Sequence, residues 1–129
     1  MLQDPLNDAM AVIKNAELAG KGECTLRPAS KLVGRVLDVM KQADYITAFE
    51  RVEDGRGGFY RVSLKGSINN CGVIKPRAAV RRTELDKWEA RYLPAQDFGL
   101  LILTTTQGVI SQGRAKEMGV GGKLIAFVY

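Results

Sequence analysis

The sequence predicts an α+β protein built of two small lobes. Its 129 residues suit one compact domain or two small lobes with a modest core. In the first half, apolar residues recur at helical spacing in two segments, with strand-like runs around them. The polar stretch 66–70 then leads to a second half dominated by strand-like runs. We therefore expect an N-terminal α-β-α-β-β lobe at residues 1–66 and a mostly β lobe with short helices at residues 67–129.

Two amphipathic helices are expected in the first lobe. Asp4 is an N-cap candidate before Pro5, which is tolerated at the first helical position, and Gly20 is a suitable end. Ser30 can cap the second helix in the same way. The apolar positions of the two helices are Leu6, Met10 and Ile13 in the first and Leu32, Val33, Val36, Leu37 and Met40 in the second.

Three strands complete the first lobe. A short strand is expected over residues 23–27, ahead of Pro28. Two longer strands, at 45–52 and 59–64, flank the Gly- and Asp-rich segment 53–58, which is typical of a hairpin connection. The two helices are then able to cover one face of this small sheet.

The second lobe opens with a short strand at residues 71–74, which we expect Lys75-Pro76-Arg77 to end. Thr83, with Asp86 three residues later, resembles a capping box for a short helix that ends before Pro94. The remaining elements are expected to be strands at 100–103 and 123–129, and between them a Thr-rich loop, a short helix near 111–118 and a glycine turn at 119–122.

The composition excludes several kinds of chemistry. The chain has no His, so it lacks the commonest general base and metal ligand. Cys24 and Cys71 alone cannot assemble a zinc site of three or four N/S ligands. We expect them to be small buried thiols of a reducing cytosol rather than a disulfide. With no P-loop or dinucleotide-binding order of glycines, the chain is expected to be non-enzymatic and to need no metal or cofactor.

The sequence predicts neither export nor membrane insertion. The first ten residues lack the basic region and apolar stretch of a signal peptide. No run approaches the roughly 18 apolar residues that a membrane span needs. We expect a cytoplasmic protein.

The charge is basic and unevenly divided. The net charge is +5, and residues 67–129 hold nine basic against five acidic side chains, whereas residues 1–66 hold ten against nine. Any one of these cations is most simply an ordinary solvated charge. Together they favour a polyanionic partner. The local concentrations are Lys75, Arg77, Arg81 and Arg82 in the second half, and Lys31 and Arg35 in the first.

The most informative segment is Thr104-Thr105-Thr106, which follows a buried apolar strand. Hydroxyls donate and accept, so they suit phosphate, the ribose 2′-OH and base edges alike, and the short helix after them would aim its N–H groups toward an anion. Equally, one Thr could cap a strand-to-helix turn while the others are only exposed. The glycines of residues 119–122 could admit a close ligand, although a helix C-cap and turn explains them more simply.

The short helix of the second lobe carries no expected site. Glu84, Asp86 and Glu89 alternate with basic residues and are expected to form a solvated face. Trp88 and Tyr92 lie four residues apart and are expected to pack within the lobe rather than stack on bases.

These residues together resemble the small-subunit ribosomal protein eight family, in its archaeal and eukaryotic branch. The resemblance covers essentially the whole chain. It rests on residues 99–116 with Thr105, Gly108 and Ala115, on Gly121-Gly122 before an apolar last strand, on Asp8, Ile13, Asn15-Ala16 and Ser30-Lys31, on Lys75-Pro76-Arg77, and on Lys87-Trp88-Glu89 and residues 93–99.

The resemblance implies a structural constituent of the small ribosomal subunit that binds a central-domain stem of its rRNA and supports early assembly. Its partners would be that rRNA and neighbouring small-subunit proteins. An alternative is a translational repressor that binds a stem in its own mRNA resembling the rRNA site. The C-terminal lobe would carry most of the specific contacts. The implied RNA-binding residues are Thr104, Thr105, Thr106, Gly108, Gly121 and Gly122, with Lys31, Lys75 and Arg77 on phosphates and Lys14 and Ser30 contributing.

Overall fold

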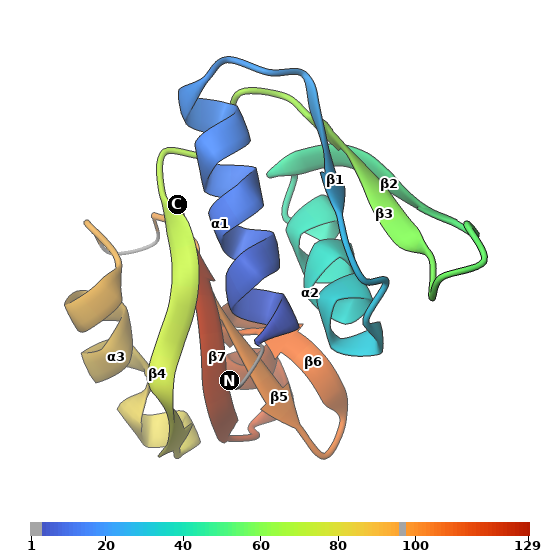
Figure 1. Ribbon diagram of the computed structural model, residues 1–129. Helices are drawn as coiled ribbons and strands as arrows, with labels where there is room; N and C mark the ends of the chain where they lie inside the picture. The colour runs from blue at the N-terminus through green and yellow to red at the C-terminus, as the bar shows by residue number, and fades with distance from the viewer. Residues whose placement is uncertain (1–3, 96–97) are drawn as a thin grey trace. The chain divides into compact units, whose positions relative to one another are not determined.

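The computed structural model describes residues 4–95 and 98–129, and its fold is α+β as predicted (Figure 1). The chain divides into two compact units, Met1–Cys71 and Gly72–Tyr129. Each unit has its own sheet, of three strands in the first and four in the second. No helix among the described residues is long and apolar enough to cross a membrane.

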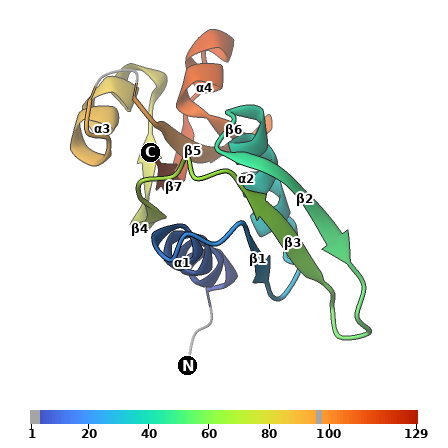
Figure 2. The same cartoon turned by 90° about the horizontal axis from the view of Figure 1, so that it is seen from above.

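The first unit has the predicted α-β-α-β-β order. Its elements are α1 (Pro5–Leu18), β1 (Glu23–Leu26), α2 (Lys31–Gln42), β2 (Ile46–Val52) and β3 (Phe59–Leu64). The strands lie in the order β1-β3-β2 and are antiparallel. Figures 1 and 2 show β2 and β3 as a long hairpin. The expected apolar positions of both helices are buried, apart from half-buried Leu32.

Two aspartates shape the first unit by accepting hydrogen bonds from nearby backbone N–H groups. The Asp4 carboxylate accepts the Asn7 N–H at 3.2 Å, so it caps α1 as predicted. Asp54 accepts the N–H groups of Arg56 and Gly58 at 2.8 and 3.0 Å and so shapes the β2–β3 connection. These bonds to the charged form lower the pKa of Asp54.

Both thiols of the first unit are free, and burial raises their pKa values. Cys71 is buried and donates to the Met10 carbonyl oxygen at 3.5 Å, and Cys24 is half-buried. Desolvation raises the pKa of Cys24 to about 11 and that of Cys71 to about 12. A thiol that stays protonated at neutral pH is a poor nucleophile and a poor metal ligand.

In the second unit, two helices pack on one face of a four-stranded sheet whose strands differ in length. Its elements are β4 (Cys71–Val80), the 3₁₀ turn η1 (Arg82–Glu84), α3 (Leu85–Tyr92), β5 (Leu100–Thr105), β6 (Gly108–Ser111), α4 (Gln112–Met118) and β7 (Gly122–Val128). The strand order is β4-β7-β5-β6, and β5 is antiparallel to both of its neighbours. The core between sheet and helices consists of Ile74, Val80, Leu85, Leu93, Leu101, Leu103, Ala115 and Leu124.

Two predicted strand ends in this unit were wrong. We expected Lys75-Pro76-Arg77 to end a strand at residue 74, but β4 continues to Val80. It is an edge strand of its sheet, where a proline's missing N–H need not break a ladder. The strand predicted to end at residue 103 also continues, to Thr105, and the unpredicted strand β6 pairs with it.

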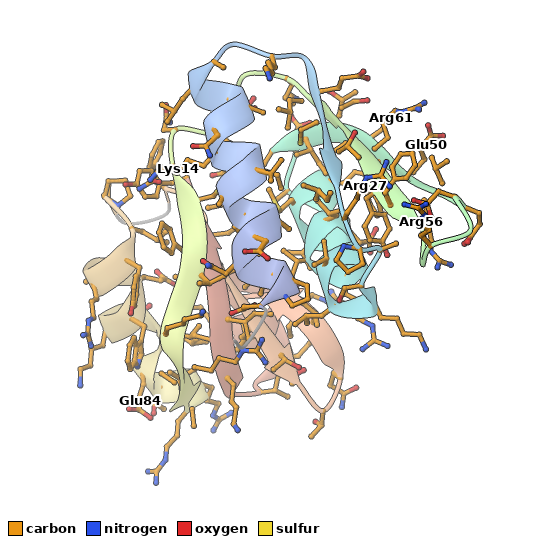
Figure 3. All side chains as sticks on the ribbon, in the orientation of Figure 1. Lys14, Arg27, Glu50, Arg56, Arg61 and Glu84 are labelled. Atoms are coloured by element: carbon orange, nitrogen blue, oxygen red, sulfur yellow. The ribbon has the colours of Figure 1, made fainter. Side chains whose placement is uncertain are left out.

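The predictions for α3 were partly wrong. Its entry is not held by Thr83 and Asp86: the carboxylate of Glu84 (labelled in Figure 3) accepts the Arg81 N–H at 3.1 Å. Glu89 does not belong to a solvated face, because it is only 7% exposed.

An ion pair with Lys116 offsets the cost of burying the Glu89 carboxylate. The Lys116 Nζ lies 2.6 Å from Glu89 and 2.7 Å from Asp86, and these bonds raise the pKa of Lys116. Trp88 and Tyr92 do pack together, with nearly parallel rings 6.1 Å apart against the core.

Candidate nucleic-acid interface

The Thr-rich segment forms a tight hairpin rather than a loop. Thr106 and Gln107 make the turn between β5 and β6. The Thr105 hydroxyl donates to the Gly108 carbonyl oxygen at 2.9 Å and accepts the Gln107 N–H at 3.0 Å. Gly108 has φ +115°, a conformation that a side chain would strain. The Thr105 hydroxyl therefore holds the turn and keeps one lone pair as an acceptor.

The three threonines have different surroundings. Leu103 points into the core beneath the helices, and side chains alternate along a strand, so Thr104 lies on the opposite face of the sheet. Its cross-strand neighbour on β7 is Lys123, which is exposed. Thr106 is exposed at the tip of the turn. Thr104 is thus half-buried on the far face of the sheet and Thr106 is exposed at the tip of the turn, whereas the Thr105 hydroxyl is engaged in the hairpin.

The glycines of residues 119–122 allow the turn before β7 to pass close to the end of β4 and to the end of β5. Gly119 ends α4 in the left-handed conformation with φ +68°, the simple C-cap considered above. A Cβ on Gly121 would lie 3.0 Å from the Arg81 Cα. One on Gly122 would lie 2.8 Å from the Thr105 Cγ2. The close approach that these two glycines permit is therefore to the end of β4 and to the hairpin.

The basic residues of β4 lie on one face of the strand. Ile74 and Val80 point into the core, and the exposed side chains alternate with them. Lys75 and Arg77 of β4 are therefore on the face opposite α3 and α4, the same face as Thr104 and Lys123. Arg81 follows the strand directly in extended conformation and continues the alternation. The structure thus brings the predicted residues Lys75 and Arg77 to the sheet face that carries one hydroxyl of the hairpin.

The predicted residues of the first unit are Ser30 and Lys31, at the start of α2, and Lys14, on α1. Ser30 is the N-cap residue of α2, and its side chain makes no capping hydrogen bond. Its carbonyl oxygen accepts the Tyr60 hydroxyl at 3.1 Å. Lys31 follows, exposed on the first turn. Lys14 is half-buried on α1 (Figure 3), and no contact among the described residues joins it to Ser30 or Lys31.

The structure adds cations that the candidate set omitted. Arg81 and Arg82 follow β4 directly beside the backbone of Gly121, and Lys123 lies across from Thr104. The charge concentration in the sequence already marked Arg81 and Arg82. Lys123 carried no such mark, because its neighbours in the sequence are glycines and apolar residues. Within the described ranges, no group of three His, Cys, Asp or Glu residues is placed to hold a metal ion.

A family profile and individual relatives both match this chain over nearly its whole length. The profile of the family described as "Ribosomal protein S8" matches residues 4–129. The chain is 59% identical to the small ribosomal subunit protein uS8 of Methanococcoides burtonii, over all of this chain and 99% of that protein. It is 54% identical to the proteins of the same name from Picrophilus torridus and Thermoplasma acidophilum, over the full length of both chains in each case.

Proposed function

The chain belongs to the ribosomal protein S8 family, and from this premise we propose that it binds small-subunit rRNA directly through its C-terminal unit. As a family member it is a non-enzymatic structural constituent of the small ribosomal subunit and acts in translation. The finer proposal is that its ligand is a stem of the central rRNA domain with an internal loop. Binding of that stem would support assembly of the subunit.

One observation carries the proposal: hydroxyls and cations meet on one face of the four-stranded sheet. Thr104 is opposite Lys123 across β5 and β7, and Arg77 lies on the same face of β4. Lysine and arginine supply phosphate affinity that weakens with salt. Hydroxyls hydrogen-bond to ribose 2′-OH groups and to the edges of unpaired bases. Specific RNA recognition typically combines these two kinds of contact at loops and bulges.

The first unit would contribute a second set of contacts. Ser30 and Lys31 stand at the start of a 12-residue helix, where backbone N–H groups and the positive end of the helix dipole favour an anion. The half-buried Lys14 would contribute charge from α1. We propose these as phosphate contacts that assist the C-terminal unit.

A titration tests the proposal. The purified chain is titrated with a short rRNA stem that has an internal loop, and with a fully paired stem of equal length, over a range of salt concentrations. We expect tighter binding of the looped stem and a loss of affinity as salt rises. Equal and weak binding of both stems would leave only nonspecific affinity of a basic protein and would refute the proposal.

A further inference from the structure

We propose that a pocket beside α3 binds a basic segment of a neighbouring protein of the small ribosomal subunit. The occupant would be one Lys or Arg side chain together with an apolar residue next to it in the partner's chain. The pocket measures about 430 Å³ and is lined by six residues, which we call the α3 pocket: Asp86, Glu89, Ala90, Leu93, Pro94 and Ala95. It lies on the helix side of the second sheet, away from the candidate RNA site, so the proposal is independent of the proposed RNA binding.

The α3 pocket has a negative end and an apolar end. Asp86, Glu89 and Ala90 occupy positions i, i+3 and i+4 and therefore share one side of α3 (Figure 1). Pro94 and Ala95 follow the helix and are exposed. A ligand in the pocket thus meets carboxylates along α3 and an apolar wall beyond its last turn.

The negative end carries more negative than positive charge. Among the described residues, Asp86 and Glu89 share a single cation, because the Lys116 Nζ lies 2.7 Å from the first carboxylate and 2.6 Å from the second. The side chain of Asp86 is 85% exposed, whereas that of Glu89 is only 9% exposed. The Asp86 carboxylate is therefore accessible to a second cation while Glu89 stays covered. In a chain of net charge +5, this end of the pocket attracts cations and repels phosphate.

The cations of α3 itself do not compensate this charge. Lys87 and Arg91 are not among the residues that line the pocket. The guanidinium carbon of Arg91 instead lies 5.2 Å from the centre of the Trp88 ring. The negative end of the α3 dipole, at its last turn, also favours a cation in the pocket.

An exposed aromatic ring extends the apolar end. Phe98 is 46% exposed, and its N–H donates to the Ala95 carbonyl oxygen at 3.2 Å, so the two residues are adjacent. Exposed aromatic side chains beside a pocket are typical anchors of protein interfaces. This combination favours a protein segment over RNA, because the phosphates of RNA would meet the carboxylates of α3.

The size and lining of the pocket suit a long basic side chain. Ligand sites generally measure roughly 300–1,000 Å³, so the α3 pocket holds one long side chain rather than a folded element. Lys and Arg bury their alkyl stems on apolar surface and keep the charged group at a polar partner. An inorganic cation would make no use of the apolar end. A peptide with a cation beside an apolar residue uses both ends.

Photo-crosslinking in the assembled small subunit tests the proposal. p-Benzoyl-phenylalanine replaces Phe98, because both residues are aromatic and this position is exposed beside the pocket. Exposed Ala95 is the second position, for use if the replacement at Phe98 prevents incorporation into the subunit. Small subunits that carry the chain are purified and irradiated, and the crosslinked peptide is identified by mass spectrometry. Yields are expressed per incorporated chain.

The crosslinking chain is also made with Asp86→Asn, Asp86→Lys or Glu117→Gln. The last is the matched control, because Glu117 is an exposed, ion-paired carboxylate of the same unit that does not line the pocket. We expect the crosslink on another protein of the subunit, within a few residues of a Lys or Arg that has an apolar neighbour. Asp86→Asn should lower the yield about two- to fivefold, the worth of one exposed charge pair. Asp86→Lys should lower it about tenfold, because like charges repel, and Glu117→Gln should leave it unchanged.

Several results would overturn the proposal. A crosslink to rRNA, to a second copy of this chain or to a protein segment without a cation would show that the α3 pocket has a different occupant. No crosslink in subunits that contain the chain, or equal yields in the Asp86 and Glu117 variants, would show that the pocket binds no basic segment. None of these results bears on the titration with the looped stem, which tests the proposed RNA binding separately.

Discussion

Replacing Gly122 with alanine tests whether the glycine turn is required for packing. The added Cβ would lie 2.8 Å from the Thr105 Cγ2 and 3.1 Å from the Thr104 carbonyl carbon, and closer still to the Thr104 carbonyl oxygen. Ordinary contacts between carbon atoms are about 3.5–4.0 Å. The hairpin must therefore move by about 0.7 Å or more to accept a single methyl group.

The expected cost follows from two opposing effects. Overpacking of this kind costs about 1–3 kcal/mol. The loss of glycine's freedom in the unfolded chain offsets about 0.4–1 kcal/mol of this. Gly122→Ala should therefore lower the free energy of unfolding by about 1–2 kcal/mol, or the melting temperature by about 5 °C for a chain of this size. The displaced Thr104 should also weaken binding of the looped stem.

Urea denaturation followed by fluorescence measures the effect, because Trp88 is the single Trp of the chain and lies on α3 of the same unit. Gly113→Ala is the matched control. A Cβ there meets nothing within 4 Å, and alanine in a helix is more stable than glycine by about 0.5–1 kcal/mol. Gly122→Ala and Gly113→Ala should thus shift the midpoint in opposite directions. If both variants unfold at or above the midpoint of the unaltered chain, the argument from close packing is refuted.

Three further predictions use the same denaturation assay. Lys116→Gln should cost about 1–3 kcal/mol, because it leaves buried Glu89 without its cation. Arg114→Gln removes only an exposed pair and should cost less than about 0.5 kcal/mol; equal costs would contradict this. Thr105→Val should cost about 1–2 kcal/mol by removing two hairpin hydrogen bonds, whereas Thr105→Ser keeps both bonds and should fall well short of that loss. The pKa values of Cys24 and Cys71, about 11 and about 12, exceed the ordinary thiol value, so the unfolded chain loses these protons first. Stability should be constant below pH 9 and fall as pH rises beyond it, and a decline that Cys71→Ala does not reduce would exclude this cause.

The sequence predicted the elements whose signals are local. The Asp4 cap, the apolar stripes of α1 and α2 and the hairpin of β2 and β3 all depend on neighbours a few residues apart. The misses depend on distant partners. That β4 continues past residue 76 depends on its edge position in the sheet, which the segment itself does not encode. Glu89 is buried because Lys116, from another helix, neutralises it.

The candidate site shows the same division between local and distant information. The sequence identified Thr104-Thr105-Thr106 as one feature, because the run is adjacent along the chain. Their separate surroundings became visible only with β6, which turns back after Thr106 and engages the Thr105 hydroxyl. Lys123 was missed because it becomes a neighbour of Thr104 only when β7 pairs with β5.

The packing of the glycines changes which residues can give the site its selectivity. Gly121 and Gly122 leave no room for a side chain at the end of β4 and at the hairpin, so packing alone is a sufficient reason for glycine at these two positions. The Thr105 hydroxyl is likewise accounted for by the turn. Under the proposed function, the groups best placed to tell one RNA from another are the hydroxyls of Thr104 and Thr106 and the exposed cations Arg77 and Lys123. Because the hairpin and these two cations belong to the same sheet, the proposed RNA would have to match both at once. A shape requirement of this kind favours one distorted stem over the many regular ones, without contact to every base.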